Sequence, residues 1–351
     1  MSATTVSAQS PGPALGSWPD WVLGRIRAAP GPSWIAYLVI FGALLVLSHA
    51  AHWLGGAVVA GTVAPTLIVE ASLPVLVLAA VDSLNGVALR SLRTLRPAMT
   101  VGEAEVGEVA GQLVRTPPRW ALVAGLLGIG VSTISVTTGP EGYGLRDGVG
   151  PITWLWELVM GAITMPVAFA FVAHALHQLR VVARVHRGMV RVDIFRLEPL
   201  AAFANLTSWT GITIVGFVAY GVGSLTLLAG IKFSAVDVAT FGVMMAVAVA
   251  IFIAPLLGLH AQILEEKERR GAEAGQALDA AVAEVHARVR AGQYEHMDQL
   301  NNALAATTSA VLTISRTSTW PWRPETLRGF ASAVGLPIFL WAMTVLLGRI
   351  I

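Results

Sequence analysis

Four ionisable side chains interrupt long apolar segments of this sequence: His49, His52, Glu70 and Glu157. His49 and His52 are three residues apart and therefore share one face of a helix. If the apolar segments cross a membrane, all four side chains lie at a similar depth, where ionisable groups are costly and usually functional. Two imidazoles and two carboxylates predict a site that binds a divalent ion or relays protons.

Each of these residues also has an interpretation in which it neither binds an ion nor carries a proton. His52 is followed by Trp53, and Glu157 follows Trp156; such aromatic neighbours are typical of the membrane boundary, where a polar side chain can reach water. Glu70 is harder to explain in this way, because Pro65 and Pro74 flank it and allow the broken helix found at many transport sites. The residues do not specify a metal or a cofactor.

Other chemical signals are weak. His174, His177 and His260 fall at the inner ends of their apolar segments, where histidines at the interface need no ligand and a metal site is the alternative. The chain has no cysteine and no phosphate-binding loop, HExxH or GxSxG motif. An enzyme is therefore the least favoured class of function, and no catalytic residue is predicted.

Long apolar helices must position these side chains. The chain is 55% hydrophobic and 13% charged, whereas soluble domains carry about 25% charged residues. A bilayer core needs about 20 apolar residues for each spanning helix. We predict an all-α integral membrane protein with about seven transmembrane helices, near 34–56, 64–84, 120–139, 152–176, 208–230, 238–261 and 329–348.

The positive charges predict the orientation of these helices. Of the 23 Lys and Arg residues, 20 lie on the side of the N-terminus, and only Arg146, Lys232 and Arg349 lie on the other side. Positively charged loops stay in the cytoplasm. We therefore expect a multi-pass protein with a cytoplasmic N-terminus and an external C-terminus, preceded at 1–33 by a disordered and interfacial segment whose short helix lies among the headgroups.

Two basic stripes favour contact with anionic lipids. Leu89, Leu92 and Leu95 alternate with arginines, which predicts an amphipathic extension of the second helix along the membrane surface. A capping box of Thr100 and Glu103 predicts a short helix at about 101–114. The predicted lipid contacts are Arg90, Arg93, Arg96, Arg180, Arg184, Arg187 and Arg191.

Residues 262–318 predict a cytoplasmic antiparallel helical hairpin between the sixth and seventh spans. Apolar residues recur every three or four positions in two stripes, which Ala291 and Gly292 separate. Residues 263–315 carry eight acidic and five basic side chains, a net charge of minus three, which disfavours nucleic acid. The two stripes are thin, so we expect a second copy of the chain or the inner loops to pack against them. A cytoplasmic protein partner at the hairpin is also expected.

The end of the hairpin carries the motif Trp320, Pro321, Trp322, Arg323, Pro324 and Glu325. In this position it resembles uncharacterised bacterial polytopic membrane proteins, which implies a bacterial inner membrane but no activity. We divide the chain into the N-terminal segment 1–33, a six-helix membrane region 34–261, the hairpin 262–318, and an interfacial collar with the seventh helix, 319–351. The expected function is a sensor, scaffold or assembly subunit that acts through the hairpin; the alternative is an ion or small-solute channel or transporter.

Overall fold

The computed structural model describes residues 16–138, 149–195, 197–229, 235–320, 325, 327–335 and 339, and only some of the side chains from 218 to 255. Within these ranges every regular element is a helix, and six helices are long and apolar enough to span a membrane. The all-helical architecture is confirmed, and six apolar helices agree with a multi-pass membrane protein. Most of the segment 329–348 lies outside the described residues, so a seventh span stays a prediction.

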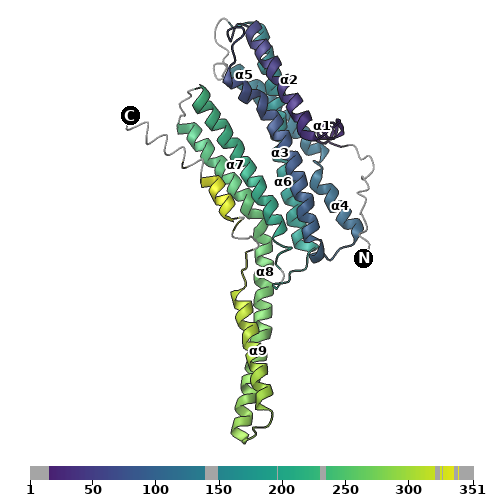
Figure 1. Cartoon of the computed structure of the whole chain (residues 1–351), viewed down its shortest axis with the longest axis vertical. Coiled ribbons are helices and arrows are strands. Elements are labelled where there is room, and N and C mark those ends of the chain that lie inside the picture. Colours follow the sequence, from purple (N-terminus) through teal and green to yellow (C-terminus); the bar gives the residue numbers. More distant parts are fainter. Residues whose placement is uncertain are drawn as a thin grey trace, which may run out of the picture.

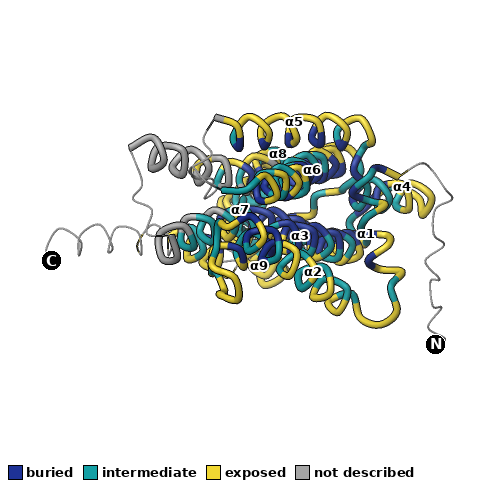
Figure 2. The backbone as a smooth tube through the Cα atoms, turned by 90° about the horizontal axis from the view of Figure 1, so that it is seen from above, coloured by how far each residue is buried: buried dark blue, intermediate teal, exposed yellow. Residues whose placement is uncertain are grey.

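The helices of the membrane bundle pack around α3 and α6, as Figure 2 shows from above. Their bounds are α2 Ser33–Leu54, α3 Pro65–Leu95, α5 Pro118–Thr138, α6 Pro151–Gly188, α7 Ala202–Ala229 and α8 Ala235–Ala291. α3 contacts α2, α6 and α7, while α6 also contacts α2, α5 and α8. The outward sides of α2 and α5 expose side chains such as Val46 and Leu126, at 67% and 61%, which suits a lipid-facing surface.

Both central helices contain a proline. Pro74 lies within α3 and Pro166 within α6, and neither proline ends its helix. Because proline has no N–H, the carbonyl four residues earlier loses its helical donor; in α3 this is the carbonyl of Glu70. Residues 57–64 are not helical, so the second span begins at Pro65.

The inner end of α3 corrects one expectation about the basic stripe. α3 continues through the protein to Leu95 instead of turning along the membrane surface. Leu92 and Leu95 are 3% and 0% exposed within the hydrophobic core. The apolar side of the stripe therefore packs on protein, which an amphipathic pattern cannot distinguish from packing on lipid.

Helix α1 (Trp18–Ala28) also packs one face on protein, and its position among the headgroups stays a prediction. Leu23 and Ile26 are buried in the core, and the indole N–H of Trp18 donates to the carbonyl of Ala121 at 2.9 Å. The guanidinium of Arg27 donates two hydrogen bonds to Oδ1 of Asp82, at 2.7 and 2.5 Å. Polar contacts of this kind hold α1 to one place on the bundle.

Helix α4 (Glu103–Val114) confirms the predicted short helix but not its cap. The cap residue is Gly102, whose N–H donates to the carboxylate of Glu105 at 3.3 Å. Thr100 instead donates to the carbonyl of Met189, and Glu103 pairs with Arg96 at 2.5 Å. The predicted pair of Thr100 and Glu103 is therefore wrong, because a tertiary contact occupies Thr100.

The long helix α8 leaves the bundle without a break, and α9 (Met297–Arg316) packs beside its distal half (Figure 1). The chain reverses through Gly292 and His296, which both have positive φ, at 66° and 58°. At the root, Nζ of Lys267 donates to the carbonyls of Ser315 and Thr317, both at 2.8 Å. This contact satisfies carbonyls at the C-terminal end of α9.

Candidate functional site

Three of the four predicted intramembrane residues meet near the ends of α2, α3 and α6. Nε2 of His52 lies 3.1 Å from Oε1 of Glu157, and both side chains are 6% exposed. Nδ1 of His52 lies 2.8 Å from the carbonyl of Ser48 and must donate to it, because a carbonyl only accepts. Nε2 is therefore the nitrogen that can exchange a proton with the Glu157 carboxyl group.

Close approach of α2 and α6 sets this geometry. A Cβ atom on Gly55 would overlap Oγ1 of Thr153, so no larger residue fits there. The N–H of Gly150 donates to the carbonyl of Gly55 at 2.7 Å, and the indole of Trp156 donates to Oγ of Ser48 at 2.9 Å. These contacts fix the end of α2 against the start of α6, where His52 and Glu157 lie.

Glu70 adds a second carboxyl group from α3. It interacts electrostatically with both His52 and Glu157, and its Oε1 is buried without a hydrogen-bond partner. Two residues further on, Oγ of Ser72 lies 2.6 Å from the hydroxyl of Tyr220 and ties α3 to α7. The outer cluster, defined as His52, Glu70 and Glu157, thus combines one imidazole with two carboxyl groups.

His49, the fourth predicted residue, does not join the outer cluster. Its Nε2 accepts the N–H of Ala64 at 3.2 Å, and its Nδ1 lies 2.9 Å from the carbonyl of Leu45, to which it donates. Its ring also packs edge-on against Trp53. Both nitrogens are occupied, so His49 has a structural role at the start of α3. Within the described part of the chain, no three His, Asp or Glu residues are arranged to hold a metal ion.

An inner polar network joins α3, α6 and the segment after α4. His174 bonds through Nε2 to Oδ1 of Asn85 at 2.8 Å and through Nδ1 to Oγ1 of Thr116 at 2.9 Å. Gln178 donates to Asn85 and to the carbonyl of Leu113, at 3.1 and 2.9 Å. Sequence reasoning missed Asn85, Gln178 and Thr116, although an amide in an apolar helix is a signal that needs a partner.

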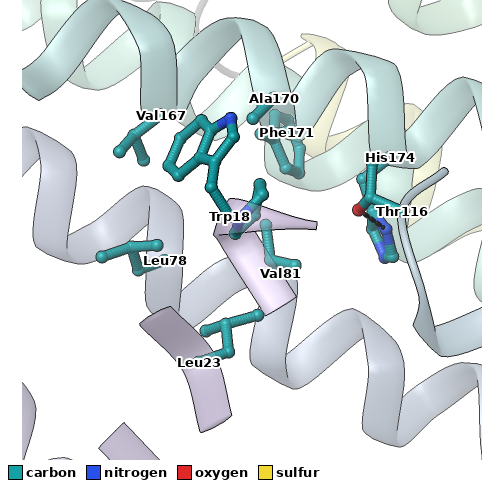
Figure 3. Close-up of a pocket in the computed structure, with 10 residues that line it drawn as sticks. Trp18, Leu23, Leu78, Val81, Thr116, Val167, Ala170, Phe171 and His174 are labelled. Carbon is teal, nitrogen blue, oxygen red and sulfur yellow. Dashed lines mark hydrogen bonds between the residues drawn. The ribbon is translucent and has the colours of Figure 1, made fainter. Parts of the chain in front are cut away.

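Beside this network lies a small cavity, shown in Figure 3. Its volume is about 10 Å³, close to the smallest space that holds one water molecule. Leu78, Val81, Val167 and Phe171 line it with apolar groups, and His174 with Thr116 forms its polar end. A cavity of this size excludes an organic substrate.

The other inner histidines have separate partners. Nε2 of His177 lies 3.1 Å from the carbonyl of Gln112. His260 stacks on Trp320 with ring centroids 4.0 Å apart, and its Nδ1 lies 2.9 Å from the carbonyl of Thr319. The alternative of a metal site formed by His174, His177 and His260 is therefore not supported among the described residues. Residues Pro321 to Pro324, in the motif at the end of the hairpin, lie outside the described residues.

The basic residues proposed to contact lipid differ in their surroundings. Arg90 and Arg93 are exposed on α3, and Arg187 and Arg191 are also exposed. Arg96 pairs with Glu103, the guanidinium of Arg180 lies 4.3 Å from the centre of the Trp120 ring, and Arg184 donates to Oε1 of Gln112 at 3.0 Å. Protein partners thus hold some of the stripe, and contact with lipid stays a prediction.

The chain matches no protein-family model, no curated protein and no solved structure. Function must therefore be inferred from the outer cluster, the inner network and the hairpin.

Proposed function

We propose that the protein is a multi-pass subunit of a bacterial inner membrane that acts as a sensor, scaffold or assembly subunit through the hairpin of α8 and α9. The observation that carries this proposal is the continuity of α8 from Ala235 to Ala291. An unbroken helix transmits a tilt or rotation of its membrane portion directly to its far end. In the proposed topology, with the N-terminus inside and the C-terminus outside, the hairpin lies in the cytoplasm.

The surface of the hairpin supports a role in binding protein. Of its apolar residues, Ile314 is buried near the root, whereas Val289, Tyr294 and Leu312 are 47%, 67% and 50% exposed. The apolar residues between α8 and α9, such as Val285 and Leu300, are only partly buried. Exposed apolar groups on a net acidic hairpin favour a protein partner with apolar and basic groups over nucleic acid.

The test is to shorten the hairpin without disturbing its root. Residues 276–309 are replaced by a short glycine-serine linker; Gly271, which packs near Ile314, and the Lys267 contacts are retained. We expect a defined set of proteins cross-linked to the full chain in native membranes to be lost from the shortened chain. An unchanged set of cross-linked proteins would contradict the proposal.

Point variants sharpen this test. Replacing Val289, Tyr294 and Leu312 together by serine removes exposed apolar groups from the hairpin without opening its buried root. The control replaces Trp21, Leu54 and Val59, which are also exposed, at 61%, 74% and 74%, but lie outside the hairpin. We expect only the hairpin variant to reduce recovery of the cross-linked partner, and equal recovery from both variants would argue against this surface.

The second candidate function is an ion or small-solute channel or transporter that uses the outer cluster. The convergence of His52, Glu70 and Glu157 from three helices favours it. Proton flux into liposomes that is unchanged in Glu70→Gln would remove the support for this alternative.

A further inference from the structure

The outer cluster contains two carboxyl groups but one imidazole. A protonated His52 can balance the charge of Glu157, whose Oε1 lies 3.1 Å from its Nε2. Among the described residues, Glu70 then has no cation of its own, and its buried Oε1 has no hydrogen-bond donor. A buried carboxylate without a partner is strongly disfavoured, whereas a protonated carboxyl group is much less costly.

The surrounding helices offer no other described charge that could balance Glu70. α2 has no charged side chain besides His49 and His52, and α7 has none; α5 has none from Trp120 to its end. His49 has both ring nitrogens occupied. On α3 the next charged residue is Asp82, about 18 Å along the helix, where it pairs with Arg27. On α6 no ionisable residue lies between Glu157 and His174. The side chain of Asp237 on α8 lies outside the described residues, as do the loop residues Glu141, Arg146, Asp147 and Lys232.

We propose that the outer cluster is a proton-binding site, in which His52, Glu70 and Glu157 retain one exchangeable proton beyond the one His52 shares with Glu157. The extra proton resides on the carboxyl group of Glu70. It leaves from there as a hydronium ion to water, and Glu70 becomes a carboxylate. No metal or organic ligand is required.

The positions of the three side chains give them different parts in this exchange. His52 and Glu157 are nearly inaccessible, at 6% side-chain exposure, whereas Glu70 is only partly buried. Glu70 is therefore the member of the cluster that we assign to proton exchange with water. In the proposed topology that water lies on the outer side of the membrane, so the bound proton reports external pH.

Loss of the proton has a mechanical consequence. Two carboxylates then face one imidazolium where α3 meets α6, and their repulsion favours separation of these helices. α6 contacts α8, which continues into the hairpin. The inference thus supplies a signal for the proposed sensor function, but the proton site can be tested without any partner of the hairpin.

The test is infrared difference spectroscopy of the purified full chain in lipid nanodiscs, titrated with acid and base. The C=O stretching band reports protonated carboxyl groups. We expect the wild-type chain to retain such a band at neutral pH and to lose it when the pH is raised. Glu70→Gln should abolish this band. Glu157→Gln should also abolish it, because Glu70 then ionises beside a protonated His52.

Two further variants separate the proposal from a general loss of structure. His52→Gln removes the only cation of the cluster, so the band should grow, an effect of opposite sign that misfolding does not produce. Glu265→Gln, which alters an exposed carboxylate on α8, should leave the band unchanged. A wild-type chain without the band at neutral pH, or a band that persists in both Glu70→Gln and Glu157→Gln, would overturn the proposal. Loss of partner binding in the shortened hairpin bears only on the proposed function.

Discussion

A close backbone contact between α5 and α6 gives a sharp prediction about stability. Gly128 of α5 lies against Pro166 within α6: a Cβ atom there would lie 2.5 Å from the nitrogen of Pro166 and 2.6 Å from its Cα. Both obstructing atoms belong to the backbone, so a side-chain rotation cannot relieve the clash. Gly128→Ala should therefore push α5 and α6 apart.

The magnitude follows from this geometry. Carbon atoms pack best at about 3.5–4.0 Å, so the helices must separate by about 1 Å, which forfeits a quarter to a half of each local contact energy. Overpacking of this kind costs about 1–3 kcal/mol. Gly130→Ala is the matched control, because Gly130 is exposed on the same helix and a Cβ atom added there would meet nothing within 4 Å.

The measurement is reversible unfolding of both variants in mixed detergent micelles, followed by circular dichroism. Helix propensity changes equally in the two variants and cancels in their difference. That difference should be about 1–3 kcal/mol, with Gly128→Ala the less stable. Equal stabilities would refute the inferred contact between α5 and Pro166 of α6.

Three further predictions concern single contacts. His186→Phe should raise the free energy of unfolding by about 1 kcal/mol, because both ring nitrogens of the buried His186 lack partners among the described residues and its ring packs edge-on against Phe203. A lower free energy of unfolding in the same assay would contradict this. Lys267→Met removes two charge-assisted hydrogen bonds to carbonyls at the end of α9, so amide hydrogen exchange should become faster there. Exchange at wild-type rates would show that these bonds do not stabilise the end of α9. Gly292→Ala should destabilise the hairpin by about 1–2 kcal/mol, because Gly292 has a positive φ, whereas Gly275→Ala within α8 should not destabilise it. Equal melting temperatures of the two variants would rule out this turn geometry.

Sequence reasoning was most successful where one segment suffices to specify an element. The apolar runs indicated the helices, and Ala291 with Gly292 marked the end of α8. It was less successful where an amphipathic face could meet either lipid or protein. The face of α1 with Leu23 and Ile26, and the inner end of α3 with Leu92 and Leu95, both pack on the core. The pattern is the same in either case, because both environments are apolar.

The candidate site shows the same division. The free-energy cost of placing an ionisable side chain inside the membrane was enough to select His52, Glu70 and Glu157, since few ionisable residues interrupt the apolar segments. The same argument selected His49, which the structure uses to accept the N–H of Ala64. It did not select Asn85 or Gln178, whose role depends on contact with His174 across two helices.

By itself the sequence determined an all-helical membrane protein, the approximate limits of its helices and a short set of ionisable residues, because hydrophobicity and charge act locally along the chain. Only the tertiary structure decided which of those residues meet. The pairing of His52 with Glu157 depends on the close approach of Gly55 to Thr153, which joins residues about 100 positions apart in the chain. Contacts between residues so far apart in the chain follow from how helices pack, and the apolar periodicity of one helix does not specify which helix packs against it.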